Sequence, residues 1–165
     1  MFKVLVSDPI SDLGIQQLMD AADVQVDKKT GLSEDELTAI IGEYDGLLVR
    51  SQTRVTERIM SAGTKLKVVG RAGVGVDNID LEAATKRGIV VINAPDGNTI
   101  TTAEHTFAMM IALARHIPQA YAKTINGVWD RKSFLGVELR NKTLGVMGKG
   151  RIGSEVAKRA KAFGM

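Results

Sequence analysis

The fold of this chain is decided by the stretch LGVMGKGRIG at residues 144–153, which continues as SEVAKRAKAF at residues 154–163. Apolar residues within the first four positions predict a short buried strand, and the apolar residues after the glycines recur at helical spacing. A strand, a glycine turn and a helix in this order are the context that the dinucleotide fingerprint G-x-G-x-x-G requires. The alternative interpretation is a glycine-rich turn before an ordinary helix.

Each glycine of the fingerprint serves pyrophosphate binding in its own way. Gly148 permits the tight turn, Gly150 lets a pyrophosphate approach the backbone, and Gly153 permits close packing of the helix on the strand. The free amides and the positive end of the helix would then face the phosphates. These three glycines are therefore predicted to bind a dinucleotide.

Two features of the fingerprint limit what it predicts. Lys149 stands between the first two glycines, where its stem either lies along the cofactor face or its ammonium group contacts a phosphate. The acidic residue that would bind the adenosine ribose is expected about 20 positions further on, which is beyond Met165. The motif therefore does not distinguish NAD from NADP.

The composition excludes several classes of function. Hydrophobic residues make up 44% of the chain and charged residues 25%, as in ordinary soluble globular proteins. The net charge of +3 arises from scattered Lys and Arg without a basic run among aromatics, so no nucleic-acid partner is predicted. The chain has no cysteine, which excludes disulfides and thiolate ligands, and no cluster of carboxylates or histidines has metal-ligand spacing. No metal site is predicted.

The sequence also lacks a pattern that indicates a membrane. The apolar run at residues 4–6 is too short for a signal peptide, and the longest run, residues 107–114, is too short to span a bilayer. We therefore expect a cytoplasmic protein.

The first 95 or so residues alternate between strand and helix patterns. Such alternation predicts right-handed crossovers and a parallel sheet, in which ligands lie beyond the carboxyl ends of the strands. Ser33 with Glu36 has the spacing of a capping box. The expected strands are residues 4–6, 24–26, 47–49, 66–69 and 88–92, and the expected helices start at Ser11 and Ser33 or span residues 56–62 and 81–86.

A loop at residues 93–98 predicts a domain boundary. Beyond it, Thr101 and Glu104 have capping-box spacing and predict a helix that runs to about Ile117, before Pro118. Residues 107–114 are apolar on all sides of this helix, so they require burial on more than one side. An interface between domains or between two subunits would provide that burial, and we expect a homodimer.

Two loops stand where a parallel sheet would hold a ligand. Residues 50–54 follow the third strand and offer two guanidinium groups, which suit a carboxylate or a phosphate. Residues 70–78 follow the fourth strand and expose glycine amides that suit an anion. The alternatives are a solvated loop and a glycine turn in which Asp77 or Asn78 caps the next helix.

The two histidines are interpreted as structural. His105 follows Glu104 directly, so the two side chains point about 100° apart on a helix and form a poor catalytic pair. His116 lies near a helix C-terminus, where a positive charge is favourable. Neither is predicted to be a general base.

Taken together, residues 49–55, 70–80, 93–98 and 148–153 resemble the N-terminal part of the D-2-hydroxyacid dehydrogenase family. The resemblance covers the whole chain. It implies an α/β fold in which residues 1–97 form a flavodoxin-like parallel-sheet domain that binds substrate. Residues 98–165 would then form an interdomain helix and the first strand and helix of a Rossmann-type nucleotide domain.

The resemblance also implies NAD-dependent oxidation of a phosphorylated 2-hydroxy acid and assigns the residues. Those facing the substrate would be Arg50, Ser51, Arg54, Val74, Gly75 and Asn98. Those facing the cofactor would be Val74, Gly148, Gly150, Arg151, Ile152 and Gly153.

The catalytic Arg, Glu and His of the family belong to a later part of the nucleotide domain, and this chain ends before them. We therefore expect the chain alone to be inactive. A second hypothesis is a non-catalytic ligand-binding or oligomerisation module. A third, a receiver-like regulatory domain, is weaker because Asp8 is the only acidic residue directly after the first strand.

Overall fold

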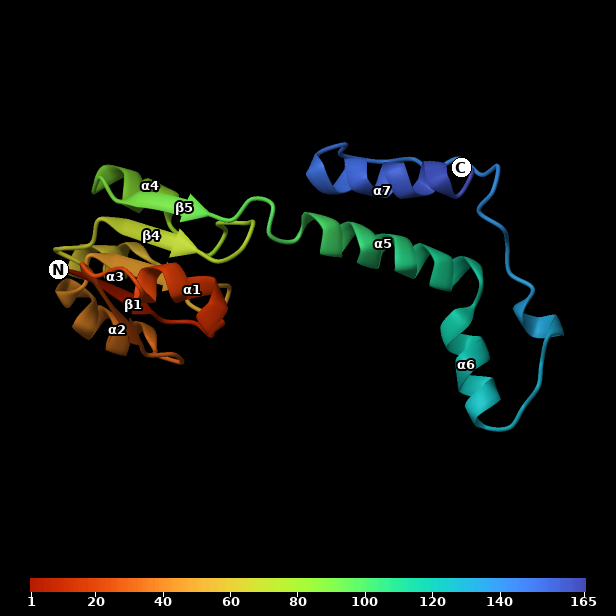
Figure 1. Ribbon diagram of the computed structural model, residues 1–165, viewed down its shortest axis with the longest axis horizontal. Helices are drawn as coiled ribbons and strands as arrows, with labels where there is room; N and C mark the ends of the chain where they lie inside the picture. The colour runs from red at the N-terminus through yellow and green to blue at the C-terminus, as the bar shows by residue number, and fades with distance from the viewer. The chain divides into compact units, whose positions relative to one another are not determined.

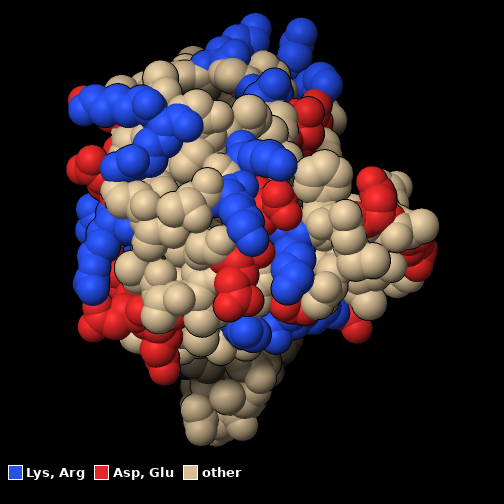
Figure 2. Space-filling model, turned by 90° about the vertical axis from the view of Figure 1, so that its left-hand side faces the viewer, with Lys and Arg blue, Asp and Glu red and all other residues tan.

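The computed structural model describes every residue from Met1 to Met165 and divides them into two compact units. Unit 1 is Met1–Gly97 and unit 2 is Asn98–Met165. No helix in either unit combines the length and the apolarity that crossing a membrane requires. Basic and acidic side chains are mixed over the face that Figure 2 shows.

Unit 1 is built on a five-stranded sheet in which all pairings are parallel and the order is β2-β1-β3-β4-β5. Figure 1 shows β4 beside β5 in this sheet. This order is that of flavodoxin-like sheets and confirms the predicted α/β fold. The fourth and fifth strands begin two residues later than predicted. The strands are β1 (Phe2–Val6), β2 (Val24–Lys28), β3 (Gly46–Val49), β4 (Val68–Arg71) and β5 (Val90–Asn93).

The helices of unit 1 lie close to the predicted positions. They are α1 (Asp12–Met19), α2 (Glu34–Ile40), the short 3-10 helix η1 (Ile41–Glu43), α3 (Glu57–Ala62) and α4 (Leu81–Lys86). The capping box predicted for α2 is present: the Glu36 amide donates to the Ser33 hydroxyl, and the Ser33 amide donates to the Glu36 carboxylate. The Ser33 amide and hydroxyl both donate to the Glu36 carboxylate, and these two bonds hold the pKa of Glu36 below its usual range.

The core of unit 1 lies between the sheet and a row of three helices, in which α2 packs on α3 and α3 on α4. Leu5, Leu47, Val69 and Val91 are register partners across four neighbouring strands, so their side chains form one apolar row. The first three of these are almost fully buried. Helix α1 packs instead against β2.

Unit 2 consists of helices α5 (Thr99–Ala114), α6 (Ile117–Ile125), the 3-10 helix η2 (Lys132–Phe134) and α7 (Arg151–Ala162). Helices α5 and α7 lie side by side (Figure 1). The rings of Phe107 and Phe163 meet edge to face, with centroids 4.7 Å apart. Val156 and Ala160 are buried on α7, which confirms the predicted apolar face of that helix.

The start of α5 differs from the prediction. The helix begins at Thr99, after Asn98, and no side chain caps it. Thr101 lies inside the helix, so the capping box predicted between Thr101 and Glu104 does not form. Glu104 instead forms an ion pair with Arg159 of α7.

The predicted single helix that ends near Ile117 is two helices. Helix α5 ends at Ala114, and His116 adopts a left-handed conformation with φ of 53°. Helix α6 then begins at Ile117 and contains Pro118 in its first turn. Proline is tolerated there because first-turn positions have no intrahelical acceptor for an N–H group. Pro118, which was predicted to end a helix, therefore lies at the beginning of the next one.

The strand predicted at residues 144–147 does not form. No regular structure is assigned to residues 144–146, no other segment pairs with them, and Met147 is a bend whose side chain is fully exposed. The physical reason is that a strand depends on hydrogen bonds to a neighbouring strand, and unit 2 contains none.

Candidate functional site

Unit 1 gathers its polar loops at the carboxyl edge of the sheet. Val49, Arg71 and Asn93 are register partners at the ends of β3, β4 and β5. The segments that follow β3 and β4 therefore emerge side by side, as predicted. We call residues 50–54 loop A and residues 72–78 loop B.

Loop A is organised by the carboxylate of Asp8, which follows β1 and is 1% exposed. This carboxylate accepts hydrogen bonds from the backbone amides of Arg50 (2.6 Å), Gln52 (3.2 Å) and Thr53 (3.1 Å). It also accepts one from the Thr53 hydroxyl at 2.5 Å. Because the carboxylate is enclosed by these donors, it does not suit the phosphate acceptor of a receiver-like domain.

Two side chains join loop A to loop B and β4. The Asn78 amide donates to the carbonyl oxygens of Arg50 (2.7 Å) and Thr53 (2.6 Å). The Arg71 Nε also donates to the Arg50 carbonyl, at 3.3 Å, and its Nη1 forms an ion pair with Asp77 at 2.9 Å. The two loops are therefore one connected structure.

Loop B presents backbone donors. The amides of Val74 and Gly75 have no acceptor within the chain. Gly75 lies beneath the ion pair of Arg71 and Asp77, and a Cβ at position 75 would come within 2.7 Å of both side chains. Any other residue at position 75 would displace this ion pair.

The glycine turn of unit 2 has the geometry that each fingerprint position requires. Gly148 has a φ of 88°, which favours glycine, and a Cβ on Gly153 would collide with the Gly148 carbonyl. A Cβ on Gly150 would meet no atom within 4 Å, so the space beside this backbone is open. The first-turn amides of Ile152 and Gly153 have no intrahelical acceptor.

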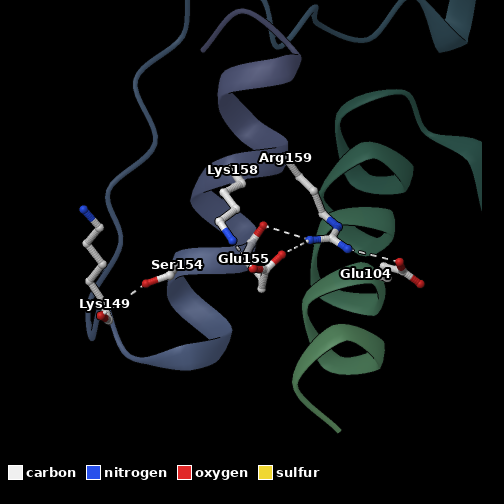
Figure 3. Close-up of polar contacts among 6 residues, drawn as sticks. All are labelled: Glu104, Lys149, Ser154, Glu155, Lys158 and Arg159. Carbon is white, nitrogen blue, oxygen red and sulfur yellow. Dashed lines mark hydrogen bonds and ion pairs between the residues drawn. The ribbon is translucent and has the colours of Figure 1, made fainter. Parts of the chain in front are cut away.

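Helix α7 is anchored on α5 by a cluster of charges (Figure 3). Arg159 donates to Glu104 of α5 at 3.1 Å and to Glu155 of its own helix at 2.9 Å. Hydrogen bonds from Lys158 and Arg159 hold the pKa of Glu155 below its usual range. The Lys149 side chain extends away from this cluster, and only its carbonyl is bonded, to the Ser154 hydroxyl.

The sequence of the chain matches the family pattern for the catalytic domain of D-isomer specific 2-hydroxyacid dehydrogenases over residues 4–163. The chain belongs to this dehydrogenase family. It is 59% identical to D-3-phosphoglycerate dehydrogenase of Synechocystis sp. over its whole length, which is 29% of that relative.

Solved structures of the dehydrogenase family share the fold. The NAD⁺-bound 3-phosphoglycerate dehydrogenase of Entamoeba histolytica is 34% identical, with a TM-score of 0.78. The D-lactate dehydrogenase of Aquifex aeolicus, solved with NAD and lactic acid, is 31% identical, with a TM-score of 0.81. The matches cover 99% of this chain and 52% and 49% of those chains. This likeness agrees with the predicted fold, because a Rossmann-type nucleotide domain belongs to the family.

The structure brings one group of the predicted site residues together in each unit. Loop A of unit 1 contains Arg50, Ser51 and Arg54, and the neighbouring loop B contains Val74 and Gly75. The fingerprint residues lie together at the start of α7 in unit 2, where Asn98 precedes α5. Their roles toward substrate and cofactor remain predictions.

Three residues that build the site were not among the site residues predicted from the sequence. Asp8, Arg71 and Asn78 hold the loops together, and each was quoted only within a motif or an alternative hypothesis. The signal that could have found Asp8 is its position, because a carboxylate directly after a buried strand lies at the ligand edge of the sheet.

Proposed function

We propose that this chain is the N-terminal part of an NAD-dependent oxidoreductase that converts 3-phosphoglycerate to 3-phosphohydroxypyruvate, the first step of serine biosynthesis. Unit 1 would bind the substrate, and unit 2 would supply the interdomain helix and the first part of the cofactor domain. The similarity to D-3-phosphoglycerate dehydrogenases along the whole chain supports this proposal.

The observation that carries the proposal is the pairing of two kinds of anion donor at one edge of the sheet. Loop A offers the exposed guanidinium groups of Arg50 and Arg54, and loop B offers the free amides of Val74 and Gly75. A phosphorylated 2-hydroxy acid carries two anionic groups, one at each end. We assign the phosphate to the guanidinium groups, which bind it by charge-assisted hydrogen bonds, and the carboxylate to the amides.

The glycine turn of unit 2 fits the pyrophosphate of NAD. Open space at Gly150 and the free amides of Ile152 and Gly153 are what a pyrophosphate at a helix N-terminus needs. Gly148 and Arg151 complete the proposed pyrophosphate set. We assign Val74 to the nicotinamide and the substrate, and Asn98 to the substrate, as the family resemblance implies. When bound, NAD supplies the acceptor for the hydride.

The chain alone should not turn over substrate. The hydroxyl proton of a 2-hydroxy acid must pass to a base within hydrogen-bond reach. His105 and His116 are the only histidines, and neither side chain has a hydrogen-bond partner that would orient it as a base. This chain's own residues therefore bind and orient the substrate but do not take its proton.

A chimera tests the proposal. The matching segment of the Synechocystis enzyme would be replaced by this chain, and NADH formation would be measured with 3-phosphoglycerate and with D-lactate. We expect the chimera to oxidise 3-phosphoglycerate and the isolated chain to show no activity. In the chimera, Arg54→Ala should lower kcat/KM for 3-phosphoglycerate by roughly tenfold or more and leave that for D-lactate unchanged. A folded chimera without activity, or an equal loss for both substrates, would contradict the proposed role.

The second candidate, an oligomerisation module, is favoured by the exposed apolar surface of α5. Met109 and Leu113 are exposed, although the helix around them is apolar. We propose that this surface pairs two copies of the chain in a homodimer. The two functions are compatible, since a dehydrogenase can also be a dimer.

A further inference from the structure

We propose that Asp8 is a positioning residue for substrate recognition: its buried carboxylate holds loop A in the one conformation that turns Arg50 and Arg54 toward an anionic group. This inference rests on the proposed function, because it assumes that loop A binds the substrate phosphate. Asp8 would not touch the substrate. It would act through the backbone of the loop.

The hydrogen bonds of Asp8 fix the backbone direction of loop A. Three of the four amides at residues 50–53, all except that of Ser51, donate to this one carboxylate. The Ser7 hydroxyl adds a contact of 3.0 Å to the Thr53 hydroxyl. The polar backbone of loop A is therefore turned inward, toward the end of β1.

The carbonyl groups of loop A are held by other residues. Asn78 accounts for the carbonyl groups of Arg50 and Thr53, and Arg71 adds a second donor to the Arg50 carbonyl. With amides held by Asp8 and carbonyls by Asn78 and Arg71, the loop is fixed from two sides. Its conformation therefore exists before any ligand binds.

This arrangement decides how loop A recognises an anion. Because the amides of Arg50, Gln52 and Thr53 are already used, they are not available to a ligand. The guanidinium group of Arg54 has no partner in the chain, and that of Arg50 donates only to the Pro9 carbonyl at 3.4 Å. Loop A is left to bind through side chains, which suits a phosphate, whereas loop B binds through its backbone.

A buried carboxylate is costly unless hydrogen-bond donors satisfy it, so Asp8 opposes any movement of loop A away from it. Moving loop A away would leave the Asp8 charge without its four donors in a site that is 1% exposed. The loop and the carboxylate therefore stabilise each other. Affinity for an anion would otherwise be reduced by the cost of ordering the loop backbone.

The test uses the 165-residue chain, with inorganic phosphate as the probe. Binding is monitored through the NMR signals of loop A. We expect phosphate to shift the signals of Arg50 and Arg54 in the wild type. Asp8→Ala should weaken this binding by about tenfold. Asp8→Asn, which keeps one oxygen facing the loop amides, should lose less. As a matched control, Ile15→Ala removes a buried side chain of α1 and should lower stability without changing phosphate affinity.

Hydrogen exchange of the wild type provides a second measurement that does not depend on the folding of a variant. The amides of Arg50, Gln52 and Thr53 should be protected without phosphate. If they become protected only when phosphate is added, the inference is overturned. Wild-type phosphate affinity in Asp8→Ala would also overturn it while leaving the proposed function intact. No phosphate-dependent shift in the wild type would reject the role of loop A itself, and the inference with it.

Discussion

Arg159 of α7 forms an ion pair with Glu104 of α5 at 3.1 Å, across 55 residues of sequence. This contact joins the helix that begins at the glycine turn to the helix that begins unit 2. Arg159 also donates to Glu155, and both carboxylates raise its pKa, that of Glu155 more strongly. The pair therefore links α7 to α5.

We expect Arg159→Ala to loosen α7, because it removes the charged contact between the two helices. Lys158→Ala is the matched control, since Lys158 contacts only Glu155 of its own helix. The midpoint of thermal unfolding and the protease resistance of α7 should fall more for Arg159→Ala than for Lys158→Ala. Equal effects would show that the contact between helices contributes nothing.

Three glycine substitutions separate packing from ligand binding. Gly153→Ala should destabilise the chain by about 1–3 kcal/mol, because its Cβ meets the Gly148 carbonyl and lies 3.1 Å from Val146. Gly150→Ala should leave stability within about 0.5 kcal/mol but weaken nucleotide binding in the chimera. Gly145→Ala, also in open space, should change neither. Urea unfolding and NAD titration measure the two effects, and a stable Gly153→Ala would contradict the packing role.

A charge on the exposed face of α5 tests the proposed homodimer. Leu113 is 75% exposed, and Leu113→Glu should convert a dimer of the chain into a monomer, because it places a charge in an apolar interface. Leu13→Glu on α1, where the side chain is 88% exposed, is the control and should leave the dimer intact. Sedimentation equilibrium gives the mass. A wild-type chain that is monomeric at all concentrations would refute the pairing.

The loss of stability at acid pH should depend on Asp45. Its carboxylate accepts hydrogen bonds from the Lys3 amide (3.1 Å) and the Lys67 ammonium group (3.2 Å), and these lower its pKa below the ordinary value of 3.8. A lowered pKa in the folded state stabilises the protein above about pH 4, and this stabilisation is lost as the pH falls through the lowered value.

The melting temperature of Asp45→Asn should therefore lie below that of the wild type at neutral pH. The two should converge as the pH drops below about 4. A difference that stays constant from pH 7 to pH 2 would show that the charge of Asp45 has no part in it.

Two pairs of residues with the same spacing show what sequence alone could predict. Ser33 and Glu36 form the predicted capping box, because the contact is local. Thr101 and Glu104 do not form one, because α5 begins at Thr99 and Glu104 forms an ion pair with Arg159, which is far away in sequence. Local chemistry predicted the first pair, but the second depended on tertiary packing that no spacing reveals.

The strands show the same limit. Apolar runs between helix patterns predicted the five strands of unit 1. These predictions are confirmed because each run has a neighbouring strand with which it pairs. The run at residues 144–147 is also mostly apolar, but it has no neighbouring strand, so no strand forms there. At the site, the loops were predictable from their place after β3 and β4. The role of Asp8 was not, because its donors lie more than 40 residues away in sequence.

The strand order has a consequence for the making of the protein. β1 leaves the ribosome before the other four strands of its sheet, yet it lies inside the sheet, between β2 and β3. Its partner β3 begins only at Gly46, so Leu5 and Val6 lack their neighbours on that side while more than forty further residues are synthesised. Parallel strands cannot pair until their crossover is complete, which makes such sheets slow to form. We expect the nascent chain to depend on chaperones until β3 and β4 have emerged.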